Sequence, residues 1–415
     1  MNMKLLTVAM LSSSLLLTAC NDDNDTTFTT KPDVPENNIK NPVVGIPQVY
    51  EKDGMSAAAT NSVLMTYKML GVNGKEVQAT ALVFTPPASV TPPKDGWRIV
   101  VWAHGTTGVA DQCAPSQEGL QGTDILLKGL LTAGYVVVAP DYEGLGEPSG
   151  KEAHPFLNVK SEAYSITDAV VAARAYLTSL GVKTNGQWMT VGHSQGGQAA
   201  LGAAQYASRA KLDYRGTVAI APASNLGTIL VSGEKLVENA PLEQKIAMYA
   251  QLDTYTALIT AGLRNSTPAL TYQDVFKVPT DQIASKADSL CTSGEQNLGQ
   301  TFAQGMGIYA AKNQNLDGYP RTQTNFMTIP SIKTFLTTDS HPLQKKVTTP
   351  VIIYQGIADT TVPKQVTDLL VASARTNGTS IPDANYRVGD WDHTSAYVDN
   401  LGNIINDVDQ LMPAQ

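Results

Sequence analysis

Runs of apolar residues along the chain have two lengths and two periods, which separate strands from helices. Five short runs are almost continuously apolar, as strands buried on both faces of a parallel sheet are; they are residues 98–103, 135–140, 187–191, 217–221 and 351–355. Residues 60–70 and 76–85 are expected to pair as antiparallel strands across a turn at 71–74, and a last strand is expected at 386–388.

Segments with helical periodicity alternate with these strands. They lie at residues 120–133, 163–180, 195–210, 364–375 and 395–411. Alternation of strands and helices predicts an α/β fold, with a mostly parallel central sheet flanked by helices. The alternation stops at Pro222 and resumes near residue 350, and the stretch between contains helical segments such as 242–263 and 302–311. We therefore expect a sheet domain formed by residues 49–221 and 346–415, with a helical cap inserted at 222–345.

The first residues have the pattern of a targeting signal. Lys4 precedes the apolar segment 5–17, which is too short to span a membrane, so residues 1–19 are interpreted as a signal peptide. The sequence Leu-Thr-Ala-Cys that ends at Cys20 resembles the lipobox of bacterial lipoproteins, whose cysteine is lipidated. An ordinary secretory signal with a chance cysteine is the alternative.

A lipid on Cys20 would anchor the protein in the bacterial cell envelope. Asn21, rather than aspartate, follows the cysteine, and by resemblance to enterobacterial sorting this favours the outer membrane. Residues 20–48 are rich in Asp, Asn, Thr and Pro, so they are expected to form a flexible tether.

Charge and cysteine content exclude several classes of function. The formal net charge is −8, and no basic stripe is present, which argues against nucleic-acid binding and against electrostatic docking on anionic lipid. Besides Cys20, the chain contains only Cys113 and Cys291, which in an exported protein are most simply one disulfide; two free buried thiols or a metal pair remain alternatives. No Cys/His cluster has metal-ligand spacing, so we expect no metal and no cofactor.

The motif Gly192-His193-Ser194-Gln195-Gly196 is the main chemical signal in the sequence. A G-x-S-x-G sequence between a strand and a helix is typical of a turn that exposes a nucleophilic serine above a sheet. The helix that follows offers free N–H groups and a positive partial charge to an oxyanion. Ser194 is therefore the predicted nucleophile.

A serine nucleophile needs a base and a group that orients the base, and in this fold the acid and the histidine follow the serine in the chain. His393 lies between the last strand and the last helix, where the base belongs, whereas His341 is expected to be structural. Asp359 directly follows the strand at 351–355 and is the predicted acid. Asp390 and Asp392 are interpreted as turn or surface residues.

An oxyanion hole requires two N–H donors. The backbone of Gln195, the residue after the nucleophile, is one predicted donor. Thr106, in the loop after the strand at 98–103, is the other, with Thr107 as its alternative. His104 and His193 are expected to be structural.

These motifs, their order and the strand pattern resemble the α/β-hydrolase superfamily and, within it, the secretory lipase family of the lipase A type. The segments that carry the resemblance are 103–108, 139–146, 192–197, 356–363 and Asp392-His393. The resemblance implies an α/β-hydrolase fold, a helical cap over the acyl site and a disulfide between the oxyanion-side loop and the cap, which fits Cys113 and Cys291. Some relatives have an acidic residue at the first oxyanion position, where this chain has His-Gly-Thr-Thr.

The apolar side chains of segment 242–263 are expected either to line an acyl tunnel or to pack in the hydrophobic core; they are Met248, Tyr249, Leu252, Tyr255, Leu258 and Ile259.

The leading functional hypothesis is a serine carboxylester hydrolase, a lipase or esterase that cleaves lipid-like or alkyl and aryl esters through an acyl-enzyme. An exopeptidase of the same fold is an alternative that would need an acidic residue in the cap, such as Glu295 or Asp288, to hold a free amine. A non-catalytic surface-binding lipoprotein is the alternative of another class. The expected partners are an ester substrate and, through the lipid on Cys20, a membrane.

Overall fold

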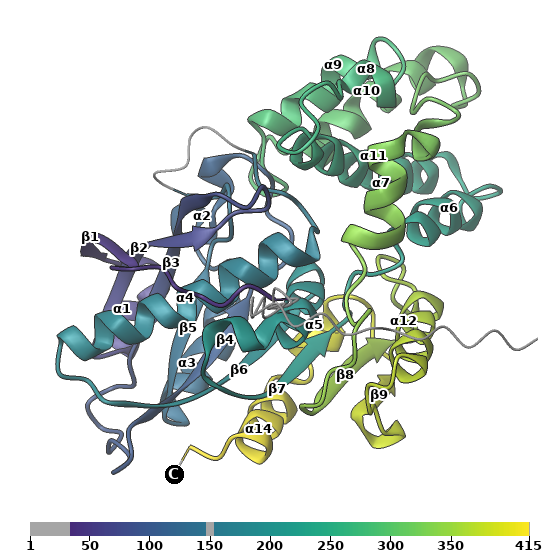
Figure 1. The fold of residues 1–415 in the computed structure, drawn as a ribbon. Helices are drawn as coiled ribbons and strands as arrows, with labels where there is room; N and C mark the ends of the chain where they lie inside the picture. The colour runs from purple at the N-terminus through teal and green to yellow at the C-terminus, as the bar shows by residue number, and fades with distance from the viewer. Residues whose placement is uncertain (1–33, 147–152, 415) are drawn as a thin grey trace, which may run out of the picture. The chain divides into compact units, whose positions relative to one another are not determined.

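A mixed β-sheet runs through the part of the chain that the computed structural model describes, which is residues 34–146 and 153–414 (Figure 1). Within these residues the sheet has nine strands in the order β1-β2-β3-β5-β4-β6-β7-β8-β9. Their bounds are β1 Val43–Val49, β2 Ser62–Leu70, β3 Glu76–Phe84, β4 Trp97–Ala103, β5 Tyr135–Pro140, β6 Thr184–His193, β7 Asp213–Ile220, β8 Val351–Gly356 and β9 Tyr386–Gly389. The pairs β1–β2, β2–β3 and β3–β5 are antiparallel, and every pair from β5 to β9 is parallel. The predicted mostly parallel sheet is confirmed.

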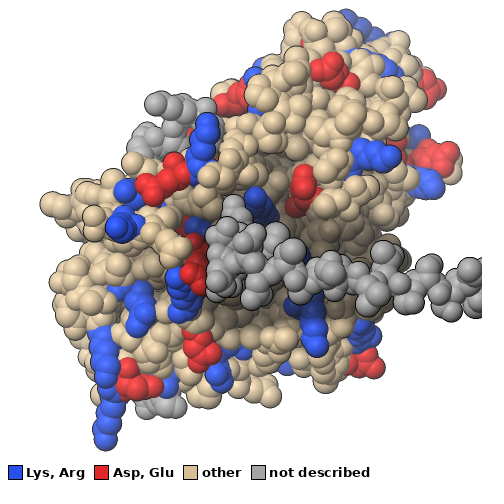
Figure 2. All heavy atoms as spheres, viewed as in Figure 1, with Lys and Arg blue, Asp and Glu red and all other residues tan. Residues whose placement is uncertain are grey.

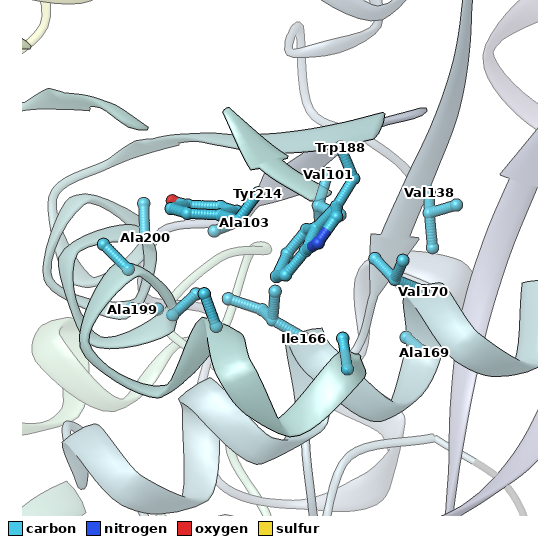
Figure 3. Packing of buried hydrophobic residues seen from close by; sticks show 14 of the residues in the cluster. Val101, Ala103, Val138, Ile166, Ala169, Val170, Trp188, Ala199, Ala200 and Tyr214 are labelled. Atoms are coloured by element: carbon cyan, nitrogen blue, oxygen red, sulfur yellow. The ribbon is translucent and has the colours of Figure 1, made fainter. Parts of the chain in front are cut away.

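Helices cover both faces of this sheet because successive side chains of a buried strand point to opposite sides. Val101 packs in the cluster formed with α4 (Val159–Ser179) and α5 (Gln195–Tyr206), whereas Val100 packs in the cluster formed with α3 (Asp124–Thr132) and α14 (Leu401–Leu411). Figure 3 shows the first cluster, where Ala199 and Ala200 of α5 face the large rings of Trp188 and Tyr214. The remaining helices of the sheet domain are α1 (Met55–Ala58), α2 (Pro115–Glu118), α12 (Lys364–Thr376) and α13 (Ser395–Val398).

The chain leaves the sheet after β7 and returns at β8. The six α-helices described between these strands are α6 (Leu226–Leu236), α7 (Leu242–Leu263), α8 (Tyr272–Val275), α9 (Thr280–Ala284), α10 (Leu298–Asn313) and α11 (Pro330–Thr334). They share an apolar core of their own, in which Leu258, Phe276 and Phe302 are buried. Figure 1 draws them, coloured from teal to green, as a group apart from the sheet. We refer to this group as the cap.

Strand β4 lies at a switch point of the sheet. From β4 the chain crosses to β5 on one side, and then, through α4, to β6 on the other side. The loops that follow β4 and β6 therefore diverge at the same edge, which in open α/β sheets is the usual position of a ligand site. Gly105 and Ser194, the residues just beyond these two strands, thus meet at this edge.

The predicted tether at 20–48 extends too far. Residues 36–415 belong to one structural unit, and strand β1 begins at Val43 and pairs with β2. Before it, the Asn37 side chain donates a 2.8 Å hydrogen bond to Asp168. Residues 36–49 are held by hydrogen bonds and by the pairing of an edge strand whose Ile46 and Val49 side chains are exposed. For this reason the pattern of apolar residues in the sequence does not identify this segment as folded. The predicted signal peptide and Cys20 lie outside the described residues.

Charged side chains of both signs are interspersed over the face drawn in Figure 2. In the described ranges, no helix is long and apolar enough to cross a membrane.

Candidate active site

Ser194 occupies the turn between β6 and α5. Its backbone angles, φ 58° and ψ −120°, lie in a region that L-residues rarely adopt. The turn is tight because the strand and the helix approach each other closely at Gly192 and Gly196. A Cβ on Gly196 would lie 1.9 Å from the Ala103 carbonyl oxygen, and one on Gly192 would lie 2.0 Å from the Gly196 oxygen, so neither position has room for a side chain. This geometry is that of a nucleophile turn.

Ser194 lies at one end of a chain of hydrogen bonds. Its Oγ is 2.9 Å from Nε2 of His393, whose Nδ1 is 2.8 Å from Oδ2 of Asp359. The Asp359 side chain is inaccessible to solvent, and its Oδ1 accepts the backbone N–H groups of Thr361 and Val362 at 2.9 and 2.8 Å. A carboxylate held in this way keeps the proton of the imidazole on Nδ1. Nε2 is then free to accept the serine proton.

The sequence predicted these three residues, and the fold brings them together although they follow three different strands. Asp359 follows β8 and His393 follows β9. Asp392, which neighbours the histidine in sequence, is exposed and accepts the N–H groups of Thr394 and Ser395 at 2.9 and 2.7 Å. It stabilises the local turn, in keeping with its interpretation as a turn residue.

His193 contacts the loop that carries His393, a contact that the sequence did not indicate. Its Nε2 lies 2.8 Å from the His393 carbonyl oxygen. Removal of the ring from water lowers the pKa of His193 to about 3, so the ring is neutral at pH 7 and donates from Nε2. The residue before Ser194 thus helps to hold the backbone of the predicted base.

The two residues predicted to form the oxyanion hole lie beside Ser194. Gln195 is the first residue of α5, so its N–H has no acceptor within the helix. Thr106 and Ser194 line the same cavities, and a Cβ on Gly105 would lie 3.8 Å from Cβ of Ser194. Thr292 of the cap binds this loop, donating to the carbonyl oxygens of Thr106 and Thr107 at 3.0 and 2.8 Å.

The predicted disulfide between Cys113 and Cys291 is present, with the two Cα atoms 5.3 Å apart. It joins the segment after β4 to the loop before α10, close to the Thr292 hydrogen bonds. Gly108 packs directly against it, since a Cβ there would lie 2.6 Å from Sγ of Cys113. The alternatives of free thiols and a metal pair are therefore excluded.

Two of the remaining histidines have the structural roles expected of them. His104 is buried, with Nε2 3.2 Å from the Asp141 carbonyl oxygen and its ring stacked on Tyr142 at 4.2 Å. Burial lowers the pKa of His104 to about 4. His341 contacts the Leu336 carbonyl oxygen through Nε2 at 2.8 Å. Among the described residues, no group of three or more His, Cys, Asp or Glu side chains is placed to hold a metal ion.

Asp141, directly after β5, should make stability depend on pH. It is fully buried, accepts bonds from the Thr80 hydroxyl and the Ser116 N–H, and burial raises its pKa from 3.8 to about 6. Because the folded pKa lies above the unfolded one, its contribution to stability is present below about pH 4 and is lost as the pH rises through about 6. Asp141→Asn can accept from Ser116 and donate to Thr80. In urea unfolding, this variant should gain about 2 kcal/mol relative to wild type between pH 4 and pH 7. A difference that does not change with pH would contradict this.

Three cavities meet at Thr106 and Tyr255. The first is narrow, about 30 Å³, and reaches from Ser194 into the cap; most of its wall is apolar: Phe156, Leu157, Leu226, Ile229, Leu230 and Ile259. The second, of about 270 Å³, is more open and contains both Ser194 and His393. The third, of about 380 Å³, lies between α7 and α10. None of the residues that line these three cavities is Lys, Arg, Asp or Glu.

Six side chains of α7 were expected either to line an acyl tunnel or to pack in the core. Two of them, Tyr255 and Ile259, line the first cavity. Leu252 and Leu258 are buried in the cap core, and Met248 and Tyr249 pack partly buried against it. Two of the six residues thus line a cavity beside Ser194, and the other four pack in or against the cap core; the acyl tunnel stays a prediction.

Solved structures share this fold at low sequence identity. The rice cell wall degrading esterase LipA from Xanthomonas oryzae matches with a TM-score of 0.66 and 22% identity, over 90% of this chain and 98% of that chain. A protein from Legionella pneumophila matches with a TM-score of 0.68 and 18% identity, over 89% of this chain and 98% of that chain. Candida antarctica lipase A in its closed state matches at 0.61 and 16%, over 88% and 80%. These similarities show the α/β-hydrolase fold.

Comparison with curated proteins finds no match. The family model described as secretory lipase matches residues 116–381, which is more than half of the chain and includes Ser194 and Asp359. The chain therefore belongs to the secretory lipase family and is a carboxylic ester hydrolase of the lipase and esterase class.

Proposed function

We propose that Ser194, His393 and Asp359 form the catalytic triad of this hydrolase and that Gln195 and Thr106 provide its oxyanion hole. The observation that carries the proposal is the pair of bonds at 2.9 and 2.8 Å that joins Ser194 to His393 and His393 to Asp359. A hydroxyl, an imidazole and a buried carboxylate in this order constitute the machinery of acyl transfer.

The reaction follows from this geometry. Nε2 of His393 takes the Ser194 proton as Oγ attacks the ester carbonyl carbon, and the carbonyl oxygen becomes an oxyanion that the Gln195 and Thr106 N–H groups stabilise. The C–O bond to the alcohol then breaks, and His393 gives its proton to the departing oxygen. Water attacks the acyl-enzyme by the same steps, which releases the acid and restores the Ser194 hydroxyl.

The positions of the cavities support one orientation of the ester. His393 must protonate the alcohol, so the alcohol belongs in the cavity that contains His393, which is the second and more open one. The acyl chain then occupies the first cavity, whose apolar wall is formed mainly by α6 and the segment at Phe156. The absence of charged lining favours neutral esters with an apolar acyl group.

The exopeptidase alternative receives less support. Asp288, one of the acidic residues that it would need, binds Arg264 and the Tyr272 hydroxyl and lines none of the three cavities. Glu295 is exposed on the cap and also lies outside their walls. A free amine would therefore find no carboxylate in them.

The test combines a phosphonate probe with a series of p-nitrophenyl esters from acetate to palmitate. We expect the probe to label wild type and not Ser194→Ala. Since burial of one methylene contributes about 0.8 kcal/mol, kcat/KM should rise about fourfold per methylene until the chain fills the first cavity, and then level off or fall. A panel of aminoacyl anilides is the control. Cleavage of anilides in preference to esters would support the exopeptidase and contradict the proposal.

Lipidation at Cys20 and attachment to the outer membrane stay predictions, which metabolic labelling with palmitate on wild type and Cys20→Ala would test.

A further inference from the structure

A buried carboxylate that takes no part in the triad lies directly beneath the residue that follows the nucleophile. Glu162, in the first turn of α4, is fully buried, and its Oε1 accepts a 2.7 Å hydrogen bond from Nε2 of Gln195. Oε1 also accepts the N–H of Leu157 at 3.0 Å, whereas Oε2 has no partner among the described residues. Burial is the largest influence on this carboxyl and raises the pKa of Glu162.

His154 completes the anchoring of the same amide. Its Nδ1 donates to the Glu143 carbonyl oxygen at 2.8 Å, so Nε2 carries a lone pair, and it accepts from Nε2 of Gln195 at 2.8 Å. The two hydrogens of the Gln195 amide thus point at two different acceptors, one on α4 and one on the segment before it. Gln195 as a whole is only 1% exposed, so both hydrogen bonds are shielded from water.

These contacts reach both sides of the oxyanion hole. The backbone N–H of His154 donates to the Val109 carbonyl oxygen at 3.0 Å, on the loop that contains Thr106. Tyr142 lies between the rings of His154 and His104, at 5.6 and 4.2 Å, and its hydroxyl donates to the His104 carbonyl oxygen at 3.0 Å. Glu162, His154, Tyr142 and Gln195 therefore form one buried cluster. It contacts the loop that contains Thr106 and the start of α5, the two segments that carry the predicted oxyanion donors.

Retaining this cluster has an energetic cost. A buried carboxylate is expensive to desolvate, even with Nε2 of His154 3.6 Å from its Oε1, and an apolar side chain in the same place would avoid that cost. An oxyanion hole gains from donors that are fixed before the reaction, because a misplacement of about 1 Å can cost about 100-fold in rate.

We propose that Glu162 and His154 are positioning residues that, through the side chain of Gln195, fix the Gln195 N–H in the oxyanion hole. The proposal rests on the proposed function only in taking Gln195 as an oxyanion donor. Glu162 itself touches no reacting atom.

A double-mutant cycle tests the proposal, with thermal denaturation of each variant as the control for folding. Gln195→Ala and Glu162→Ala should each lower kcat for a neutral p-nitrophenyl ester about 10- to 100-fold and leave KM within about twofold. The double variant should fall no further than the lower single variant, because the two side chains act as one unit. Glu162→Gln retains an oxygen for both donors and should restore kcat to within about threefold of wild type.

Ser165→Ala is the matched control. Ser165 lies one turn further along α4, is equally buried and bonds to the Glu143 N–H at 3.0 Å, without touching Gln195. It should lower stability and leave kcat unchanged. Additive losses in the cycle, or a Glu162→Ala variant that keeps wild-type kcat, would overturn the proposal.

The rate at which a phosphonate labels Ser194 separates this proposal from the proposed function. The labelling rate depends on the oxyanion hole both in an ester hydrolase and in a peptidase. Across the variants it should therefore decrease in the same order as kcat. Normal labelling without ester hydrolysis in wild type would contradict the ester hydrolase, and the labelling rates of the same variants would then still test the cluster. Equal labelling rates in wild type and Glu162→Ala would overturn the positioning role alone.

Discussion

Replacing His393 by alanine should lower kcat about 10⁴- to 10⁶-fold, the largest effect on activity that we expect apart from loss of Ser194 itself. His393 is the only ionisable side chain recorded within hydrogen-bond distance of Ser194 Oγ, among the residues that the structure describes. Without it the serine hydroxyl keeps its proton and remains a weak nucleophile. KM should change little, because the cavities proposed to bind the ester are formed mainly by other residues.

Two further variants separate the triad from its surroundings. Asp359→Asn leaves the backbone donors of Thr361 and Val362 in place but removes the charge that stabilises the imidazolium, and we expect kcat to fall about 10⁴-fold. Asp392→Asn changes an exposed carboxylate next to His393 in sequence and should keep kcat within about threefold, provided that the turn bonds to Thr394 and Ser395 persist. Steady-state kinetics on one p-nitrophenyl ester measures all three variants. Near-wild-type kcat in His393→Ala would refute the triad.

The order of strands and helices was predictable because buried parallel strands are short, apolar and separated by amphipathic helices. The strands predicted at 98–103, 135–140 and 351–355 agree with β4, β5 and β8 to within one residue at each end. Strand β1 was missed, since Pro47 and Gly45 interrupt it and its exposed edge carries no alternating pattern. The helix predicted at 395–411 is two helices, α13 and α14, because Asn400 adopts non-helical angles between them.

The predicted site residues depended on their places at the ends of strands. Ser194, Asp359 and His393 each follow a recognisable strand, and parallel strands present such residues at one edge. The supporting residues carry no such signal. Glu162 lies in α4 and His154 just before it. Both are hydrogen-bonded to Gln195 only because the fold buries the three side chains together. Neither the composition nor the hydrophobic periodicity of the sequence predicts such a tertiary contact.

The disulfide and several hydrogen bonds connect the cap to the segment that follows β4. The disulfide of Cys113 with Cys291 and the two bonds from Thr292 to the loop at Thr106 lie side by side in the chain. The cap therefore supplies part of the wall of the first cavity and also supports the loop that contains Thr106. Loss of the covalent contact should weaken both functions at once.

Removing the disulfide between Cys113 and Cys291 should cause a large loss of thermodynamic stability. It spans 178 residues, and in the chain-entropy model a loop of this length stabilises the folded state by about 5 kcal/mol. For about 380 folded residues, the melting entropy converts this loss into a Tm lower by roughly 6 °C. The double variant Cys113→Ala/Cys291→Ala, followed by calorimetry without reductant, measures the difference.

Reductant provides the matched control for this variant, because it should act only through the bond. Dithiothreitol should lower the Tm of wild type to that of the double variant and leave the variant unchanged. Since Gly108 packs against Cys113 and lies two residues after Thr106, we also expect the variant's kcat to fall severalfold at a temperature where it is folded. A variant that melts within 1 °C of wild type would show that the bond contributes little, and an equal effect of reductant on both proteins would show that the loss has another origin.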